Sequence, residues 1–396
     1  MYHLKQLKSA SSLISRYKGN EPLHTFLKKY FSENKKHGST DRKNITNFCY
    51  AYFRLGKLSF AANTEERILT SLLMSNPVNK KLLEVLKPDW IPLFDRAITE
   101  KISFANIENL ATGIFPFCEM LSKEINCINY NFSFLTQPDL FVRIRPGMKS
   151  VVLQKLYLSK IDYEVIDDLS IRFPANTNLD NIFNVGKEVI IQDFNSQRIR
   201  FFMQPLLRSN EEIPLEVWDA CAASGGKSIL AYDLNNTIKL NVSDIRDNIL
   251  QNLNTRFSIA DIKNYNSFTV DLSDAEISNR SLKEGIKLKL FDFVVADVPC
   301  TGSGTWARTP ESLYYFNPKQ VLKYSDLQKK IIDKTVKHVK PGGHFLYITC
   351  SVFNAENESQ VEYILKNKKL KLEKMEILKG YDQNADSLFA ALFIAL

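Results

Sequence analysis

The first third of the chain places apolar residues at spacings of three and four, which is the pattern of helices with one buried face. One of these stripes ends at a polar break, Asn76-Pro77, and consists of Ile68, Leu69, Leu72 and Leu73. Similar stripes follow one another up to about residue 130, and no strand pattern alternates with them. We therefore expect residues 1–134 to form an all-helical domain.

A different pattern begins near residue 135. Three strand-like stretches and one helical stretch follow one another, at 141–145, 150–159, 163–173 and 188–192. We expect a small α+β module of ferredoxin-like type over residues 135–205. Arg143, Arg145 and Lys149, on its first strand and turn, are either candidates for contact with a phosphate backbone or part of an ordinary solvated face.

From residue 206 to the end, short apolar runs alternate with helical patterns. The runs are rich in β-branched and aromatic residues and lie at 216–220, 239–244, 268–271, 291–298 and 344–349. Such alternation predicts a parallel sheet covered by helices on both faces. Two further runs, 374–378 and 388–395, predict a closing pair of strands. Ligands of such sheets bind beyond the carboxyl ends of the strands.

Composition and charge narrow the class of protein. The 396 residues include 52 Lys+Arg and 44 Asp+Glu, and 44% are hydrophobic, which indicates a soluble globular chain and argues against disordered and membrane classes. Ten basic and three acidic residues lie within 1–45, so most of the net charge of +8 is found there. A basic terminal region on a balanced protein favours a polyanionic partner.

The six cysteines show no CxxC spacing, which disfavours both a disulfide framework and a zinc site. We expect a reduced, cytoplasmic protein without a bound metal. The first twenty residues contain no acid and faintly resemble a transit peptide, but their apolar residues recur at helical spacing. We favour a retained amphipathic helix for this segment.

The most informative loop joins the run at 216–220 to a helical stretch. It contains paired glycines, Gly225 and Gly226, so that a ligand can approach the backbone at a helix start. A phosphate-binding P-loop requires glycine where this chain has Cys221, and the dinucleotide fingerprint requires a third glycine in register. The class of ligand that remains compatible with this loop is a nucleoside with a short charged tail.

Two carboxylates at the next strand ends extend this interpretation. Asp244 is positioned to accept hydrogen bonds from two ribose hydroxyls, and Asp271 from an exocyclic adenine amine. Either residue alone could instead cap a helix. Together with the glycine loop they favour an adenosine without a phosphate chain, and S-adenosylmethionine fits that description better than ATP or NAD.

Two cysteines, Cys300 and Cys350, directly follow the runs at 291–298 and 344–349. This arrangement suits methylation at carbon 5 of a pyrimidine, in which a thiolate adds to C6 and an acid donates a hydrogen bond at N3. Asp297 is a candidate for that acid. Strand position alone leaves open which thiol attacks, and a cysteine that directly follows proline, as Cys300 does, is the nucleophile in DNA cytosine methylases.

In these motifs the chain resembles a known family, the RNA cytosine-5 methyltransferases of the NOL/NOP/Sun (RsmB-like) type. Its motifs occur in the expected order, at Asp219–Lys227, Asp297–Cys300 and Thr349–Ser351, with agreement also at Lys340–Gly343 and Glu356-Asn357. The resemblance covers residues 140–396. It implies a Rossmann-like class I methyltransferase domain over residues 206–396, with S-adenosylmethionine as cofactor.

The resemblance also implies roles for single residues. The thiol equivalent to Cys350 is the nucleophile of the family, and the one equivalent to Cys300 assists release of the methylated RNA. Asp297 and Lys227 complete the expected catalytic set. The expected cofactor contacts are Cys221, Ala222, Ala223, Ser224, Gly225, Gly226, Lys227, Asp244, Asp271 and Asp297.

The chain departs from the family pattern at two positions. Ser224 stands where the family usually has proline, and Val298 replaces alanine in the motif that ends at Cys300. In the N-terminal part, the segment 38–56 resembles the NusB-like RNA-binding domain of bacterial members that modify ribosomal RNA.

We therefore expect an enzyme that forms 5-methylcytosine in RNA, with ribosomal RNA as the first candidate. Transfer RNA is an alternative substrate, and a non-catalytic ribosome-assembly factor is the alternative outside the class. We expect a monomer that binds neither membrane nor metal. Trp306, Arg308 and Tyr314, which follow Cys300, are candidates for contacts to flanking nucleotides or for simple packing.

Overall fold

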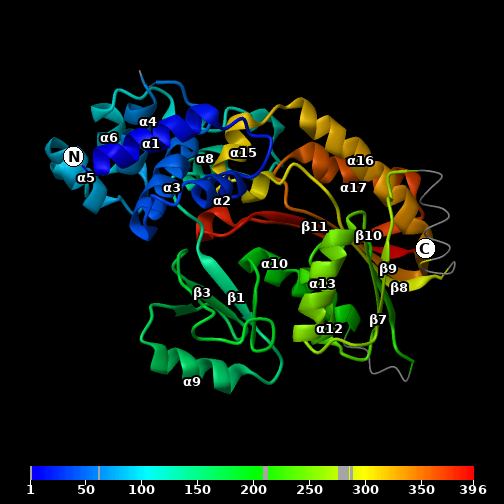
Figure 1. The fold of residues 1–396 in the computed structure, drawn as a ribbon. Coiled ribbons are helices and arrows are strands. Elements are labelled where there is room, and N and C mark those ends of the chain that lie inside the picture. Colours follow the sequence, from blue (N-terminus) through cyan, green and yellow to red (C-terminus); the bar gives the residue numbers. More distant parts are fainter. Residues whose placement is uncertain (1, 61–62, 208–212, 275–284, 286–288) are drawn as a thin grey trace. The chain divides into compact units, whose positions relative to one another are not determined.

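The computed structural model describes residues 2–60, 63–207, 213–274, 285 and 289–396 (Figure 1). The chain forms two compact units, each built from segments that are distant in sequence. The helical unit contains Met1–Leu121, Ile125–Pro138 and Thr305–Asn317, and the sheet unit contains Ser122–Glu124, Asp139–Gly304 and Pro318–Leu396.

The helical unit consists of α-helices and short 3-10 turns. Its helices are α1 (Tyr2–Arg16), α2 (Leu23–Glu33), α3 (Ser39–Arg54), α4 (Thr64–Met74), α5 (Lys80–Leu86), α6 (Ile98–Phe104), α7 (Leu110–Gly113), α8 (Cys127–Ser133) and α15 (Pro310–Tyr315). Phe48 and Phe53 of α3 are fully buried in its core. α4 begins where the side chain of Asn63 accepts a hydrogen bond from the backbone of Glu66. The prediction of a helical N-terminal region is confirmed.

The segment that follows Cys300 in sequence belongs to the helical unit. Trp306 is 3% exposed, and its ring lies 4.8 Å from that of Phe316. The buried guanidinium of Arg54 donates to the backbone carbonyl of Ala307 and so fixes the segment to α3. Of the two alternatives for Trp306, the structure therefore supports simple packing, because its ring is buried against Phe316.

Cys118 and Cys127 form a disulfide in the helical unit. This pairing contradicts the expectation drawn from the absence of CxxC motifs. The two cysteines are nine residues apart in sequence, and the turn between them brings their Cα atoms to 5.6 Å. Spacing rules for metal and redox motifs do not cover such a loop.

A four-stranded antiparallel sheet forms the first part of the sheet unit, in the order β2-β3-β1-β4. Its elements are β1 (Leu140–Ile144), α9 (Lys149–Ser159), β2 (Glu164–Val165), β3 (Ser170–Phe173) and β4 (Val189–Ile191). Arg143 is 1% exposed and donates to Asp233 at 2.6 Å, and Arg145 pairs with the same carboxylate at 2.7 Å. The proposed phosphate contact is wrong for Arg143, because Asp233 holds it in the interior.

The larger sheet has seven strands in the order β10-β11-β9-β8-β5-β6-β7. They are β5 (Glu216–Asp219), β6 (Lys239–Asp244), β7 (Tyr265–Thr269), β8 (Phe291–Asp297), β9 (Val339–Thr349), β10 (Leu370–Leu378) and β11 (Leu388–Ala395). The strands from β7 to β9 pair in parallel, and the last two are antiparallel. The parallel sheet and the closing strand pair are confirmed, although β7 begins and ends earlier than the apolar run at 268–271.

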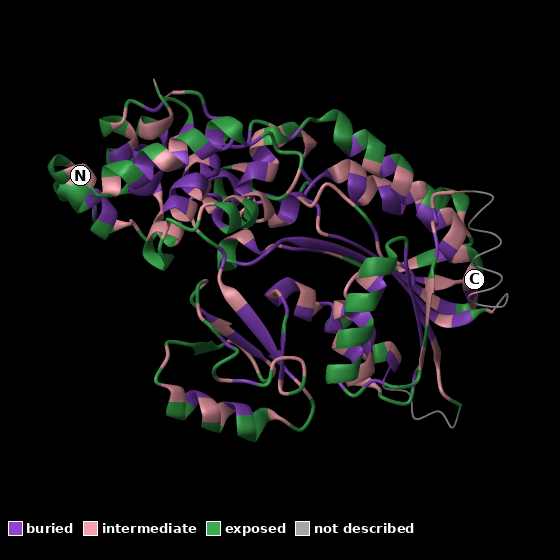
Figure 2. Cartoon of the chain, in the orientation of Figure 1, coloured by how far each residue is buried: buried purple, intermediate pink, exposed green. Residues whose placement is uncertain are grey.

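Helices cover both faces of this sheet. α12 (Gly226–Leu234) and α13 (Asp247–Ile259) lie on one side in Figure 1, and α16 (Lys319–Thr335) and α17 (Glu358–Asn367) lie on the other. Figure 2 shows the long strand β11 in the colour of buried residues, whereas the edge strands β7 and β10 are largely intermediate or exposed. This architecture confirms the predicted Rossmann-like methyltransferase fold, and the domain boundaries predicted from the sequence remain a prediction.

Candidate active site

The strand order reverses between β5 and β8, and a cavity of about 550 Å³ opens at the carboxyl ends of these strands. From β5 the chain continues to β6 and β7 on one side, whereas β8 and β9 extend the sheet on the other. Such a switch point leaves a crevice between diverging loops, where ligands of parallel sheets bind. The cavity is lined by residues at or just after the ends of five strands, among them Cys221, Asp244, Asp271, Asp297, Cys300 and Cys350.

The loop between β5 and α12 is held in a strained conformation. Ala223 has a φ of 46°, and Gly225, directly before α12, has a φ of 83°. A side chain at Gly225 would also meet the ring of Phe257 at 2.7 Å, so that position requires glycine. The backbone N–H of Ala222 donates to the carbonyl of Ser243, which fixes the loop against the end of β6.

Ser224 is anchored from α13. The guanidinium of Arg256 donates to both the backbone carbonyl and the hydroxyl of Ser224, each at 2.8 Å. Burial lowers the pKa of Arg256 from its usual value. A proline at this position would restrict the loop through its own ring, whereas in this chain an arginine from the neighbouring helix supplies an external restraint.

The two carboxylates predicted to bind the nucleoside both line the cavity. Asp244 accepts from the backbone of Ala223 at 3.0 Å and from Arg246, and these donors hold its pKa below the usual value in spite of burial. Asp271 lies two residues after β7 and accepts from the backbone and hydroxyl of Ser273. Both side chains are thus oriented by neighbouring residues.

Lys227 and Asp297 form an ion pair at the end of β8, with 2.8 Å between Nζ and Oδ2. Burial alone would lower the pKa of Lys227, but the carboxylate of Asp297 outweighs it and raises this pKa. The nearby Asp219 is 2% exposed, and burial raises its pKa to about 7. Asp219 accepts from Ser228 at 2.6 Å through one oxygen, while its other oxygen has no hydrogen-bond partner.

The sulfur atoms of Cys300 and Cys350 lie 3.2 Å apart. Their strands β8 and β9 are parallel neighbours, which brings the loops that follow them together. The contact with Cys350 and burial raise the pKa of Cys300 well above the usual value. Gly304 donates its backbone N–H to the carbonyl of Cys350, and a Cβ at this glycine would lie 2.0 Å from the carbonyl oxygen of Ser387.

The structure therefore gathers most of the predicted site residues around one cavity. Ala222, Ser224, Gly225, Gly226 and Lys227 lie behind the lining, in the loop and the first turn of α12. Sequence reasoning missed an arginine and several apolar lining residues, namely Ile245, Arg246, Val270, Leu272, Leu327 and Ile331. Arg246 could have been found from its place just after a strand end, whereas the apolar residues of α16 carry no local signal.

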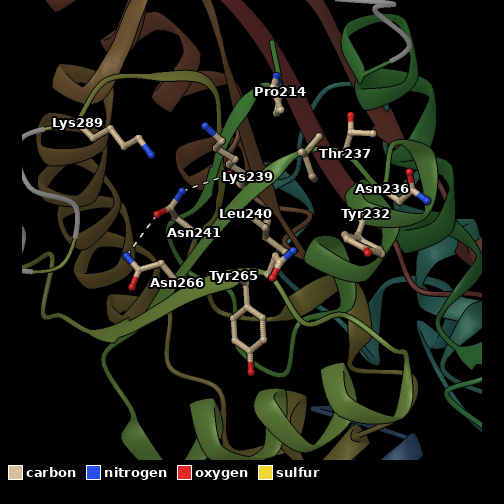
Figure 3. Close-up of a pocket in the computed structure, with 12 residues that line it drawn as sticks. Pro214, Tyr232, Asn236, Thr237, Lys239, Leu240, Asn241, Tyr265, Asn266 and Lys289 are labelled. Atoms are coloured by element: carbon tan, nitrogen blue, oxygen red, sulfur yellow. Dashed lines mark hydrogen bonds between the residues drawn. The ribbon is translucent and has the colours of Figure 1, made fainter. Parts of the chain in front are cut away.

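A second pocket lies at the opposite edge of the same sheet (Figure 3). It contains the first residues of β6, including Lys239 and Asn241, together with Tyr265 and Asn266 of β7. Asn266 donates to the amide oxygen of Asn241 at 3.3 Å. This pocket is at the amino ends of the strands and contains none of the predicted site residues.

In the ranges that the structure describes, no group of three or more His, Cys, Asp or Glu side chains could hold a metal ion. Among the described helices, none is long and apolar enough to cross a membrane.

Most of the sheet unit is similar in sequence to known methyltransferases. Residues 203–391 match the family model of the 16S rRNA methyltransferases RsmB/F. The chain is 28% identical over 183 residues to ribosomal RNA small subunit methyltransferase B of Xylella fastidiosa, a match that covers 46% of this chain and 40% of that protein. With the Shewanella oneidensis protein of the same name it shares 31% over 153 residues, covering 38% of this chain and 33% of that one.

The chain thus spans two fifths or less of the length of these curated relatives. The crystal structure of PH0851 has a similar fold, with a TM-score of 0.67 and 17% identity over 98% of both chains. The family match includes the loop after β5 and both cysteines, which are the segments that form the cavity. Residues 203–391 thus match a methyltransferase domain of the RsmB/F type, and methyltransferases of this type use S-adenosylmethionine as methyl donor.

Proposed function

We propose that this chain methylates carbon 5 of cytosine in RNA, with ribosomal RNA as substrate and S-adenosylmethionine as methyl donor. The observation that carries the proposal is the pair of thiols 3.2 Å apart in the cavity that contains Asp297. Methylation of an exocyclic nitrogen requires no thiol, so two cysteines facing one another support chemistry at carbon. The family match supports RNA as the polymer.

The residues present fit the methyl donor. The cavity of about 550 Å³ has apolar walls, such as Val270 and Leu272, suited to an adenine ring. Asp244 is positioned for the ribose hydroxyls, and Asp271 for the exocyclic amine. Of the loop from Cys221 to Lys227, Cys221 and Ala223 line the cavity, and we propose that the loop and the start of α12 lie beneath the charged tail. When bound, the sulfonium supplies an electrophilic methyl group.

We assign the remaining steps of the reaction to residues of this chain. The thiolate of Cys350 forms a bond to C6 of the cytosine, and the electrons displaced toward C5 make that carbon nucleophilic. We assign to Asp297, which pairs with Lys227, a hydrogen bond accepted from the exocyclic amine and a proton shared with N3, so that N3 takes up the charge released by addition at C6. After methyl transfer the C5 proton leaves to a base, the C5–C6 double bond re-forms, and the C6–sulfur bond breaks to return the thiolate. We assign Cys300 to this release step.

The cytosine must leave its stack to reach the cavity, so we propose an unpaired or weakly paired target. The helical unit supplies the basic surface for RNA, with exposed Lys28, Lys29, Lys35 and Lys36. We propose a cytoplasmic monomer, and we retain the division into a helical domain (1–134), a small module (135–205) and a catalytic domain (206–396).

Methylation with labelled S-adenosylmethionine, followed by mapping of 5-methylcytosine, tests this function. The substrates are ribosomal RNA and transfer RNA that lack modifications, and Cys350→Ala is the inactive control. We expect label at cytosine C5 of ribosomal RNA. Methylation of transfer RNA alone would show that transfer RNA, and not ribosomal RNA, is the substrate. Methylation of neither RNA would favour an RNA-binding assembly factor.

A further inference from the structure

A buried carboxylate connects the two cysteine loops. Glu356 is 0% exposed and lies in the short turn Asn354–Glu356 after β9. It accepts from the backbone N–H of Thr301 at 2.9 Å and from the hydroxyl of Thr301 at 2.6 Å. It also accepts from the hydroxyl of Ser351. Thr301 directly follows Cys300 and Ser351 directly follows Cys350, so one carboxylate ties together the neighbours of both thiols.

Other bonds keep Glu356 in place. Gln328 of α16 donates to its carboxylate at 3.2 Å and to the carbonyl of Pro299 at 3.1 Å. The hydroxyl of Tyr347, on β9, donates to the backbone carbonyl of Glu356 at 2.8 Å. The carboxylate is therefore held from three elements, and a change in its position would move both cysteine loops.

The charges around the thiol pair are asymmetric. The carboxylate of Glu356, whose own pKa is raised by burial, is among the groups that raise the pKa of Cys300, after the contact with Cys350 and burial. On the other side, the ammonium group of Lys227 interacts with Cys350. The carboxylate of Glu356 thus disfavours a thiolate on Cys300.

We propose that Glu356 is the positioning residue of the thiol pair: its carboxylate, bound to the neighbours of both cysteines, sets the separation of the sulfur atoms, and its negative charge disfavours a thiolate on Cys300. The effect of the charge on Cys300 is independent of the proposed function. Only the reaction of a thiolate with cytosine rests on that function.

Alkylation with iodoacetamide tests the charge without RNA or cofactor. Mass spectrometry of peptides gives the rate at each cysteine as a function of pH. In the unmodified protein we expect Cys350 to react at lower pH than Cys300, and the reverse order would overturn the proposal even if every variant failed to fold. Glu356→Gln should raise the rate at Cys300 by about tenfold, since loss of a neighbouring charge shifts a pKa by about one unit.

Two further variants separate charge from geometry. Glu356→Asp keeps the charge but is too short to reach Thr301 and Ser351 together, so we expect protection of Cys300 to persist while methylation falls. Glu362→Gln, an exposed change on α17, is the matched control and should alter neither measurement. Equal alkylation of folded Glu356→Gln and unmodified protein would refute the proposal. Normal alkylation order with no methylation of any RNA would refute the proposed function alone.

Discussion

Cys300 and Cys350 come from loops fifty residues apart, yet their sulfur atoms lie within 3.2 Å of each other. This proximity follows from the parallel pairing of β8 with β9, in which Asp297 lies opposite Ile348. Two thiols in contact cannot both ionise readily, because the second charge is repelled by the first. The contact therefore disfavours two thiolates at once, which suits a two-step covalent mechanism in which one thiol attacks while the other stays protonated.

Replacement of each cysteine should produce different defects. Cys350→Ala should abolish methylation because no nucleophile remains to add to C6. Cys300→Ala should instead accumulate a protein–RNA adduct that survives denaturation, because release is slowed after the bond has formed. Gel shift under denaturing conditions and methyl incorporation measure these outcomes.

Cys49→Ala is the control for loss of a thiol, since Cys49 is buried in the core of the helical unit. It should retain methylation and show no adduct. An adduct that requires Cys300 and forms without Cys350 would reverse the two roles.

Asp219→Asn should change how stability depends on pH. The pKa of Asp219 is about 7 in the folded protein and 3.8 in an ordinary exposed setting. Between these values the folded chain retains a proton that the unfolded chain has lost, so folding loses stability as the pH rises from about 4 to about 7. The variant should escape this loss, which amounts to at most about 4 kcal/mol.

Urea denaturation across this pH range measures the effect, with Asp168→Asn as a control because its side chain is 91% exposed. We expect the free energy of unfolding of Asp219→Asn, relative to the unmodified protein, to increase with pH and to level off above about pH 7. A constant difference across the range would show that Asp219 ionises normally.

The restraint on Ser224 should contribute to cofactor binding. Arg256→Ala removes both hydrogen bonds to Ser224, and Ser224→Ala removes the one to the hydroxyl. A net hydrogen bond contributes about 1 kcal/mol, so the smaller change should weaken binding by roughly fivefold and the larger by more. Calorimetric titration with S-adenosylmethionine measures this affinity.

Thr255→Ala serves as the control on the same helix, because the Thr255 hydroxyl bonds to the backbone of Gln251 within α13. The expected kinetic effect is a higher KM for the cofactor with little change in kcat. A fall in kcat alone would place Arg256 in the chemistry and contradict a role in loop positioning.

Reversal of four exposed lysines, Lys28, Lys29, Lys35 and Lys36, to glutamate should weaken RNA binding. Each phosphate contact that is lost leaves fewer counterions to be released on binding. The slope of log affinity against log salt concentration should therefore become shallower by roughly one unit per contact. Cofactor affinity should not change, because the cavity lies within the sheet unit. Filter binding over a series of salt concentrations provides the measurement.

The matched control reverses four exposed lysines of the sheet unit, namely Lys323, Lys366, Lys369 and Lys371. If both quadruple variants lose the same affinity, net charge and not a basic surface on the helical unit governs RNA binding. Lys29 also forms an ion pair with Glu21 at 2.7 Å, so a variant that leaves Lys29 intact should be measured in parallel.

The sequence by itself determined the order of elements and most of the cavity. Strand patterns ended close to the observed strands because buried parallel strands need continuous apolar runs. Asp244 and Asp297 lie at the carboxyl edge because they end strands, and the two cysteines because they follow strands closely; topology brings such ends together. The motifs also carried the resemblance to the RNA cytosine-5 methyltransferases, and the segments that contain them lie within the matched residues 203–391.

Only the tertiary structure decided which side chains are partners. Arg143 belongs to the interior because Asp233, ninety residues away, neutralises it, and Trp306 belongs to the helical core. The restraint of Ser224 by Arg256 and the bridge made by Glu356 join residues whose spacing carries no signal. Local patterns report periodicity and turns, whereas long-range hydrogen bonds depend on how strands and helices pack, and that is why the sequence left them undetermined.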